Sequence, residues 1–355
     1  MSPRNLRVGV VGCGGISRNH LTAFGSVEGA EVVAVCDNDL EKARATAEKF
    51  SVPCAYRSTE EVLGHGVDLV SVCTPHPTHE DAVLAAAAAG VHVLCEKPIA
   101  TDLVAAERMV RACDDAGVKL GVFLQRRFWP EAQRMRTALK AGELGTPILG
   151  ECTVLLERTT DYYAEAPWRG KWATCGGGVL MTQAIHHLDL LQWLIGDVAE
   201  VYGRVATFRH SDHIEVEDSA VATLFFTSGA MATLQASTAV NPSLGAQVRV
   251  TTSSGASVQL TEFPEGTDGR MDIWAKDGRI RSEHPFPASA DPHVVLADVN
   301  RRLMPHHTAQ VADFVAAVRS GQPPAVCGED ATRALRTLLA IYESSRTGQV
   351  VPVSG

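Results

Sequence analysis

The sequence predicts an α/β protein with two domains, and three observations support this expectation. Apolar strands alternate with helical segments over residues 1–125, which is typical of βαβ units in a doubly wound parallel sheet. After Gly145-Thr146-Pro147 the pattern changes to strands joined by short turns, which favours a mostly antiparallel sheet. The length of 355 residues also suits two domains of ordinary size. We therefore expect one domain over residues 1–125 and a second, also α/β, over residues 126–355.

The strands of the first domain are expected as short apolar runs, because a parallel sheet is buried on both faces. Helical segments separate these runs, and Gly90 follows one of them in the position of a C-terminal cap. The expected strands are 6–11, 31–36, 67–73, 91–95 and 119–124, and the expected helices are 16–27, 39–50, 76–89 and 102–116.

The second domain is expected to combine more strands with fewer helices. Thr227-Ser228-Gly229 separates two strand segments and is typical of a hairpin turn. The C-terminal helices can pack back onto the first domain. The expected strands are 198–208, 219–226, 230–237 and 247–251, and the expected helices are 178–194, 308–318 and 330–345.

Composition excludes several classes of protein. The formal net charge is −9 and no basic block occurs, which disfavours nucleic-acid binding. Nine scattered cysteines include Cys36, Cys73 and Cys95 in apolar strands, which favours buried, reduced thiols. The segment before the first strand is too short for a signal peptide, and the longest apolar run is too short to cross a membrane. We expect a cytoplasmic protein that does not bind membranes.

The first turn reads Gly12-Cys13-Gly14-Gly15-Ile16-Ser17 and predicts a dinucleotide-binding site. Gly12 permits the tight turn, and Gly14 and Gly15 let a pyrophosphate approach the backbone. The helix that begins near Ile16 offers unpaired N–H groups to the phosphates. Ser17 stands where glycine or alanine is usual, and it is small enough for close packing of helix and strand.

Asp37 ends the second strand and predicts a preference for NAD over NADP. A carboxylate there accepts hydrogen bonds from ribose hydroxyls and repels a 2′-phosphate. Asn38 follows it as a further expected cofactor contact. The alternative is that Asp37 only caps the next helix, a task that Asp39 can equally perform. Arg44 or Arg57 could instead accept a 2′-phosphate.

Thr74-Pro75 ends the next strand, where its backbone is expected to contact the dinucleotide. His79 is also expected near the cofactor, although a capping or packing role is an open alternative. His306 and His307 lack acidic or cysteine partners in a recognisable pattern, so we expect a solvated or capping role for them and no metal site.

Two motifs predict proton transfer. Glu96-Lys97-Pro98 follows a buried strand, which places Lys97 beside the nicotinamide; a surface lysine is the alternative. Gly176-Gly177-Gly178 precedes a helix and would permit close approach of a ligand. In that helix Thr182, His186 and Asp189 share roughly one face, so that Asp189 can orient His186 as acid or base. A core histidine held by Asp189 is the alternative, and His187 is expected to be structural.

These residues together resemble the Gfo/Idh/MocA oxidoreductase family over essentially the whole chain. The matching features are the glycine fingerprint, Asp37, Thr74-Pro75 with His79, Glu96-Lys97-Pro98, and the glycine run with His186 and Asp189. The resemblance implies an N-terminal Rossmann domain and a C-terminal α/β domain with a large, mostly antiparallel open sheet. It also implies catalytic Lys97 and His186, and a homodimer or homotetramer formed through that sheet.

Thr182 departs from the family pattern, which often has an aspartate four residues before the histidine. The Thr182-Gln183 pair is similar to an Asn-Gln pair in a branch that includes sugar-nucleotide dehydrogenases, and this departure weakens the case for inositol as substrate. The resemblance also implies that Glu96 and Gln125 lie near the cofactor. The expected substrate contacts are Arg127, Tyr163, Trp168, Arg169, Trp172, Thr182, Gln183 and Asp189.

The substrate region combines aromatic rings with cations. Rings such as Tyr163 and Trp168 can stack on a sugar, and Arg169 can hold a carboxylate or phosphate. Trp168 and Trp172 are four residues apart, so a packing pair is an equal alternative.

The expected activity is hydride transfer between NAD and a secondary alcohol or ketone of a sugar, glycoside, inositol or sugar derivative. Two alternatives remain at this point. One is an enzyme that recycles its NAD while cleaving a glycoside by transient oxidation and elimination. The other is a dinucleotide-binding regulator without catalysis.

Overall fold

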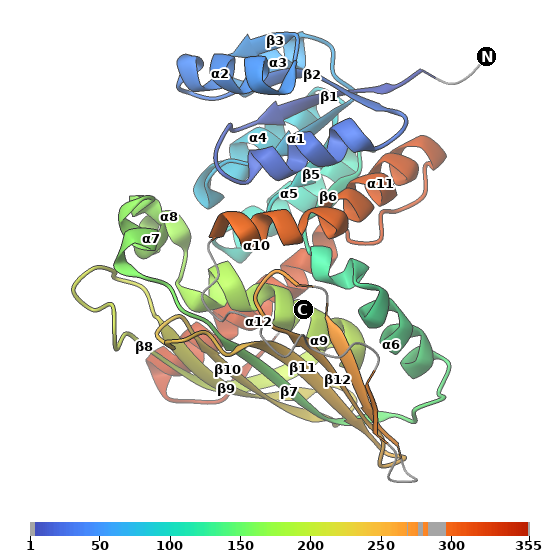
Figure 1. The fold of residues 1–355 in the computed structure, drawn as a ribbon, viewed down its shortest axis with the longest axis vertical. Coiled ribbons are helices and arrows are strands. Elements are labelled where there is room, and N and C mark those ends of the chain that lie inside the picture. The colour runs from blue at the N-terminus through green and yellow to red at the C-terminus, as the bar shows by residue number, and fades with distance from the viewer. Residues whose placement is uncertain (1–3, 268, 276–279, 283–295, 354–355) are drawn as a thin grey trace. The chain divides into compact units, whose positions relative to one another are not determined.

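The computed structural model describes residues 4–267, 269–275, 280–282 and 296–353. The chain forms two compact units, shown in Figure 1. The first consists of Met1–Gln125 with Met304–Thr332, and the second of Arg126–Leu303 with Arg333–Gly355. The predicted α/β class is confirmed, with a parallel sheet in one unit and a mostly antiparallel sheet in the other.

The described strands of the first unit form one sheet in which every pair is parallel. Their order β3-β2-β1-β4-β5-β6 is that of dinucleotide-binding folds. The short strand β3 was not expected from the sequence. The strands are β1 (Leu6–Val11), β2 (Ala30–Cys36), β3 (Cys54–Tyr56), β4 (Leu69–Val72), β5 (His92–Cys95) and β6 (Leu120–Val122).

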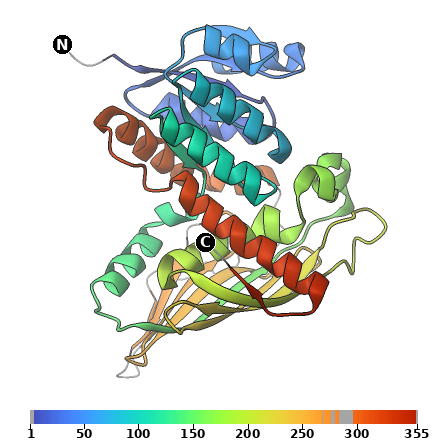
Figure 2. The same ribbon diagram turned by 180° about the vertical axis from the view of Figure 1, so that it is seen from behind.

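Helices cover both faces of this sheet. Helices α1 and α11 lie on the face seen in Figure 1, and α4 and α5 lie on the face seen in Figure 2. Gly90 follows α4 with a φ of 71°, which confirms its capping role. The helices are α1 (Ser17–Ser26), α2 (Leu40–Phe50), α3 (Thr59–Gly64), α4 (His79–Ala88), α5 (Leu103–Asp115) and α11 (Met304–Ser320).

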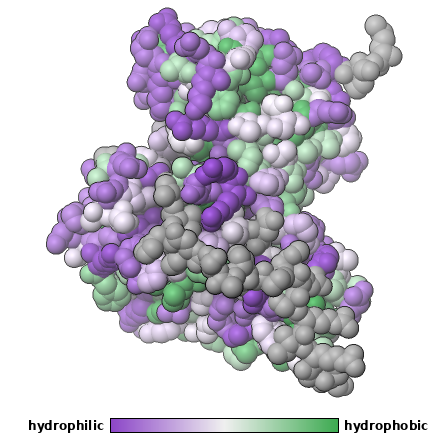
Figure 3. Space-filling view, viewed as in Figure 1, coloured by the Kyte–Doolittle hydropathy of each residue, from purple (hydrophilic) through white to green (hydrophobic). Residues whose placement is uncertain are grey.

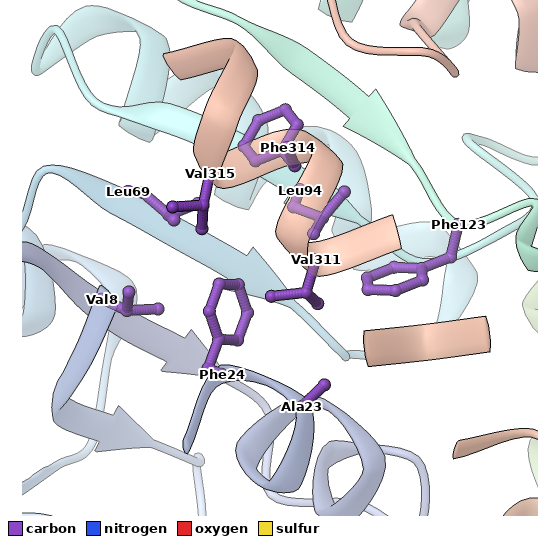
Figure 4. Close-up of a cluster of buried hydrophobic side chains, with 9 residues drawn as sticks. All are labelled: Val8, Ala23, Phe24, Leu69, Leu94, Phe123, Val311, Phe314 and Val315. Atoms are coloured by element: carbon purple, nitrogen blue, oxygen red, sulfur yellow. The ribbon is translucent and has the colours of Figure 1, made fainter. Parts of the chain in front are cut away.

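Helix α11 completes the core of the first unit, although it lies about 180 residues beyond β6 in the chain. Its side chains Val311, Phe314 and Val315 pack against residues of α1 and of the parallel strands (Figure 4). Gly121 of β6 makes this possible, because a Cβ there would lie 2.7 Å from the ring of Phe314. The cluster consists of Val8, Ala23, Phe24, Leu69, Leu94, Phe123, Val311, Phe314 and Val315.

The expectation of solvated or capping histidines on this helix was wrong. His306 and His307 are 5% and 1% exposed. The His307 ring lies 5.5 Å from that of Phe123, so it belongs to the packed interior. His306 and His307 are the first buried residues of α11. Because histidine is polar, the sequence pattern did not indicate that they are buried.

The second unit is built on a sheet with the order β14-β13-β12-β11-β7-β10-β9-β8-β15 among the described residues. All its pairs are antiparallel except β7 with β10. The central strand β7 was missed, because its polar residues mask its alternation. The strands are β7 (Pro147–Leu155), β8 (Val198–Ala206), β9 (Ser219–Phe226), β10 (Met231–Ser237), β11 (Gly245–Thr252), β12 (Ser257–Glu262), β13 (Arg270–Trp274), β14 (Ile280–Ser282) and β15 (Val351–Pro352).

Helix α9 (Ile185–Ile195) packs on one face of this sheet. Gly150 of β7 lets it approach, because a Cβ there would lie 2.6 Å from Ile195. A π-helical turn, Leu180–Ala184, precedes α9. The other helices are α6 (Pro130–Lys140), α7 (Thr160–Ala164), α8 (Trp172–Cys175), α10 (Leu296–Arg302) and α12 (Gly328–Thr347).

The opposite face of the sheet carries several exposed apolar side chains. Leu149, Met231 and Phe225 are lateral neighbours on β7, β10 and β9, and Val221 and Tyr202 lie on the same face. Leu149, Met231 and Val221 are each about half exposed, at 50%, 49% and 53%. Hydrophobic patches interrupt the polar surface along the lower edge of this unit in Figure 3. Among the helices described, none is both long and apolar enough for a membrane crossing.

Candidate active site

The turn between β1 and α1 has the form of a pyrophosphate cradle. Gly12 has a φ of +91°, and a Cβ there would lie 2.9 Å from the Cys73 carbonyl carbon. An added Cβ at Gly14 or Gly15 would meet nothing within 4 Å. The turn therefore requires glycine at Gly12 for its own packing, and it leaves open space over Gly14 and Gly15 for a ligand. The Ser17 hydroxyl donates to the Gly14 carbonyl at 2.7 Å, which explains how serine is accommodated.

Asp37 lies at the end of β2 and contacts this turn. Its carboxylate accepts hydrogen bonds from Cys13 N at 2.9 Å and Asp39 N at 3.1 Å, and it pairs with Lys42 Nζ at 3.0 Å. Burial alone would raise the pKa of Asp37, but these hydrogen bonds and Lys42 lower it below its usual value. The carboxylate is therefore held in its charged, accepting form. The adjacent Asn38 is exposed.

The capping role belongs to Asp39, which leaves Asp37 available for another task. The Asp39 side chain accepts from Glu41 N and Lys42 N at the start of α2. The contact between Lys42 and Asp37 was not predicted from the sequence. The two residues are five positions apart, and only the geometry of α2 brings the lysine next to the carboxylate.

Thr74 and Pro75 follow β4 at the same edge of the sheet. His79 ties this strand end to the Lys97 turn, since Nε2 lies 2.9 Å from the Thr74 carbonyl and Nδ1 lies 3.0 Å from the Pro98 carbonyl. Burial lowers the pKa of His79, while the carbonyl contacts oppose this shift. His79 is fully buried, which is the packing arrangement left open above. The buried Thr74 Oγ1 has no hydrogen-bond partner among the described residues.

Glu96 links the Lys97 turn to α1. Its Oε1 lies 2.9 Å from His20 Nε2, and its Oε2 accepts from Lys97 N at 3.1 Å. The other nitrogen of His20 lies 2.7 Å from the Ser71 hydroxyl. Burial would raise the pKa of Glu96, but His20, Lys97 and His307 lower it to about 2. Glu96 therefore fixes the backbone from which Lys97 projects.

Lys97 and Gln125 both follow strands of the parallel sheet, β5 and β6. Gln125 is 4% exposed, and its Oε1 has no hydrogen-bond partner among the described residues. A buried amide oxygen in this state is ready to accept a hydrogen bond from a ligand. These features fit a bound dinucleotide. The backbone is open at Gly14 and Gly15, Asp37 is a charged acceptor, and the buried polar atoms Thr74 Oγ1 and Gln125 Oε1 have no hydrogen-bond partner among the described residues.

In the second unit, two glycines of the 176–178 run pack closely against other parts of the protein. A Cβ at Gly177 would lie 2.1 Å from the Tyr342 hydroxyl, and one at Gly178 would lie 1.7 Å from the Glu217 carbonyl. Gly177 and Gly178 are therefore required by close packing within the protein. Glu217 and Tyr342 lie far along the chain, so no local pattern could have revealed this.

The π-helical turn after the glycines carries Thr182 and Gln183. The Thr182 hydroxyl lies within hydrogen-bond distance of the Gly178 carbonyl at 2.7 Å and also contacts Gln183 Oε1. Gln183 Nε2 donates to the Tyr162 hydroxyl at 3.2 Å. This chain of contacts explains why a glutamine accompanies the threonine. π-Helical turns recur at functional sites, and His186 follows this one, 5% exposed.

Arg169 contacts the rings of both Tyr162 and Trp168. The Arg169 guanidinium lies 4.3 Å from the Tyr162 ring centroid and 5.6 Å from that of Trp168, and Nη1 donates to the Tyr162 carbonyl at 3.1 Å. Arg158, paired with Glu265 at 2.6 Å, lies 5.2 Å from the Tyr162 ring. Several expected substrate contacts thus form one cluster that reaches Gln183.

Arg127 and Asp189 form a buried pair. Arg127 Nε and Nη2 donate to the two carboxylate oxygens at 2.8 and 2.6 Å, and the side chains are 4% and 2% exposed. The neighbouring Arg126 binds Glu262 in the same bidentate way at 2.8 and 2.9 Å. His187 Nε2 lies 2.9 Å from Glu262, as suits its expected structural role. Arg126 and Arg127 thus each form a bidentate ion pair with a carboxylate of the second unit.

Tyr163 and Trp172 have other partners within the second unit. The Tyr163 hydroxyl lies 3.1 Å from that of Thr238, and its ring helps to line a pocket of about 440 Å³ with Lys171 and Glu215. Trp172 is 43% exposed and donates from Nε1 to the Glu215 carbonyl at 2.9 Å. Its ring meets Tyr342 edge-on at 5.2 Å.

The fold and the cofactor cradle define an NAD-binding oxidoreductase. A family model described as an oxidoreductase family with an NAD-binding Rossmann fold matches residues 6–124. A second model, for the GFO/IDH/MocA C-terminal domain, matches residues 132–258. The chain therefore belongs to the Gfo/Idh/MocA family, and the resemblance inferred from its motifs is confirmed.

Relatives match over nearly the whole chain. D-apiose dehydrogenase of Paraburkholderia graminis is 31% identical over 96% of this chain and 88% of its own length. Myo-inositol 2-dehydrogenase of Thermotoga maritima is 28% identical over 93% of each. The WlbA dehydrogenase of Bordetella pertussis, solved with NADH and UDP-GlcNAcA, is 31% identical with a TM-score of 0.82, covering 99% of this chain and 100% of that one.

Proposed function

We propose that this enzyme transfers a hydride between NAD(H) and a secondary alcohol or ketone of a sugar, glycoside, inositol or sugar derivative. The observation that carries the proposal is the position of Lys97, two residues after the end of β5. The carboxyl ends of parallel strands lie at one edge, so Lys97 shares that edge with the Gly14 turn and Asp37. Full-length relatives that are named dehydrogenases of apiose and inositol support this class of substrate.

In this proposal Lys97 and His186 manage the proton of the alcohol. Bound NAD would supply the hydride acceptor. His186 takes the hydroxyl proton during oxidation and returns it during reduction, which suits an imidazole. Lys97 donates a hydrogen bond to the alcohol or carbonyl oxygen, since an ammonium stabilises negative charge on that atom. Glu96 and His79 hold the turn that carries Lys97.

We further propose that the substrate is held by the cluster of Tyr162, Trp168, Arg169 and Gln183. Aromatic rings suit the apolar faces of sugar rings, and the amide and guanidinium suit their oxygens. The contact from Gln183 to Tyr162 supports this, because it connects the cluster to the helix of His186. The buried pair of Arg127 and Asp189 then supports that helix from within.

The activity is tested by following the absorbance of the reduced nicotinamide with purified protein, NAD and a panel of sugars, glycosides, uronates, inositols and sugar nucleotides. We expect a rise that depends on one class of these compounds. Product formation without net NADH, detected by mass spectrometry, would instead indicate a recycled cofactor. Tight NADH binding with no product from any class would contradict the proposal.

Asp37 is proposed to select NAD over NADP. Replacing it in Asp37→Ser removes the charge that opposes a 2′-phosphate and leaves Lys42 as a cation beside it. We expect NAD to bind about 10- to 100-fold more weakly, since a hydrogen bond to a charged group contributes roughly 1.5–3 kcal/mol, and NADP to bind more tightly. Titration of intrinsic fluorescence with each cofactor measures this.

The matched control for this prediction is Asp39→Asn, which keeps the capping oxygen at the start of α2. It should leave the ratio of NAD to NADP affinity unchanged. An unchanged ratio in Asp37→Ser as well would show that Asp37 does not select the cofactor.

We propose that the exposed sheet face of Leu149, Met231 and Val221 is covered in a homodimer or homotetramer. Met231→Glu should lower the mass in solution to that of a monomer, because a carboxylate would be buried against an apolar surface. Light scattering after size exclusion measures the mass. Val104→Glu, at an apolar residue 69% exposed on α5, is the control and should leave the mass unchanged. A wild-type monomer would refute the assembly.

We also propose a cytoplasmic location. All nine cysteines are thiols, and most are buried in the two cores. Burial raises the pKa of Cys13 to about 11 and that of Cys36 to about 12, which keeps these thiols protonated and unreactive. Unpaired thiols in this number are typical of proteins from reducing compartments.

A further inference from the structure

The helix that carries His186 begins at a buried carboxylate from a distant part of the chain. Glu217, which is 2% exposed, lies just before β9. Its Oε2 accepts from Gly178 N at 2.8 Å, and its Oε1 accepts from Leu180 N at 3.0 Å. Its backbone carbonyl accepts from Val179 N at 3.1 Å. One residue therefore satisfies three successive N–H groups at the start of this helical segment.

Hydrogen bonds and close packing both hold the start of this helical segment. The first N–H groups of a helix have no partner within it, and a carboxylate there is favoured by the helix dipole. The absence of a side chain at Gly178 lets the Glu217 backbone pack directly against the turn. The Tyr342 hydroxyl of α12 donates to Oε1 at 2.8 Å and fixes the carboxylate from the other side.

The residue that follows Glu217 has a different set of partners. The next residue, Asp218, accepts hydrogen bonds from the backbone N–H groups of Phe208, Arg209 and His210 at 2.8–3.1 Å. β9 begins at Ser219, whose hydroxyl donates to Asp218 at 2.9 Å. Asp218 thus holds the 208–210 segment to the start of β9, whereas Glu217 holds the start of the segment that leads to His186.

We propose that Glu217 is a positioning residue for the reaction, which holds the helix start so that Thr182 and His186 project correctly. This inference rests on the proposed role of His186 as acid or base. Glu217 acts only through the backbone of the helix and touches no reacting atom. Displacement of a catalytic group by about 1 Å can reduce turnover by roughly 100-fold, so a loosened helix start should lower kcat.

The variant Glu217→Gln tests this with little change in size. Its amide nitrogen must face one of the backbone N–H groups, so one donor loses its acceptor. We expect kcat to fall about 10- to 100-fold, with little change in KM or in NADH affinity. Glu217→Asp, which keeps the charge on a shorter side chain, should restore part of kcat and also serves if Glu217→Gln does not fold.

The matched control is Asp218→Asn, which weakens an equally buried carboxylate of the same strand end that has no contact with the helix start among the described residues. A merely structural role for Glu217 predicts equal losses of kcat in the two variants at equal thermal stability. We expect Asp218→Asn to retain kcat within about twofold. Equal losses, or an unchanged kcat in Glu217→Gln, would overturn the proposal.

A second readout does not depend on the proposed activity. The imidazole NMR signals of His186, assigned by their loss in His186→Asn, should shift in Glu217→Gln and remain in place in Asp218→Asn. Unshifted signals in Glu217→Gln would overturn the positioning role even if no substrate is found. Shifted signals without turnover in the wild type would retain the positioning role and refute the proposed function.

Discussion

Lys97→Met is expected to lower kcat by about 100- to 1,000-fold, the usual loss when one donor that stabilises charge on the reacting oxygen is removed. The methionine keeps the length of the side chain and removes only the ammonium. NADH affinity should change little, because the cofactor is proposed to rest on Gly14, Asp37, Thr74 and Gln125. Turnover is measured by nicotinamide absorbance, and binding by fluorescence titration.

Two further variants define what this result means. Lys49→Met removes an exposed lysine from α2 of the same unit and should retain full turnover. His186→Asn should lower kcat to a similar extent as Lys97→Met, since both groups are proposed to manage one proton. Rates near that of the wild type in both Lys97→Met and His186→Asn would rule out the proposed chemistry.

The second large effect is expected on stability in acid, through Glu96. Its pKa is about 4.5 in an unfolded chain and about 2 in the folded protein. A carboxyl with a lowered folded-state pKa stabilises the fold above its unfolded pKa, and this stabilisation is lost as pH falls through the folded value. Between about pH 4.5 and pH 2 the loss should approach roughly 3 kcal/mol, at 1.36 kcal/mol per pKa unit.

Denaturant unfolding of the wild type and Glu96→Gln over this pH range isolates the effect. The difference in free energy of unfolding between the two proteins should be constant above about pH 5 and shrink as the pH falls. Glu41→Gln controls for the loss of a carboxylate, because that side chain is 79% exposed. A difference that does not depend on pH would mean that Glu96 is not held ionised by His20 and its neighbours.

Much of the first unit could be predicted because its signals are local. The signals are the apolar runs, Gly90 and the glycine fingerprint. Each of them determines the structure of the chain within a few residues of its own position. The short strand β3 was missed because three half-buried residues give no clear pattern. The sequence predicted that C-terminal helices can pack back onto the first domain, and α11 does so, but its particular contacts could not be derived, since they join Phe314 to strands far away in sequence.

The sequence predicted which residues belong to the candidate site, but it did not predict most of the contacts that hold them in place. Asp37 and Lys97 follow strands, so topology alone places them at one edge of the sheet. Lys42 contacts Asp37, and His20 contacts Glu96, the residue before Lys97. Both contacts depend on helix geometry that no local sequence pattern reveals. The same limit applies to Glu217, whose contact with the glycine run joins segments 39 residues apart.

The central claim is that a hydride passes directly from a carbinol carbon of the substrate to NAD. The most direct measurement uses the best substrate of the panel, deuterated at that carbon, with the wild-type protein and NAD. The account predicts that mass spectrometry finds the deuterium in the reduced cofactor, and at least about 100-fold less when Lys97→Met is used for the same time. Turnover that leaves the cofactor free of deuterium would contradict it.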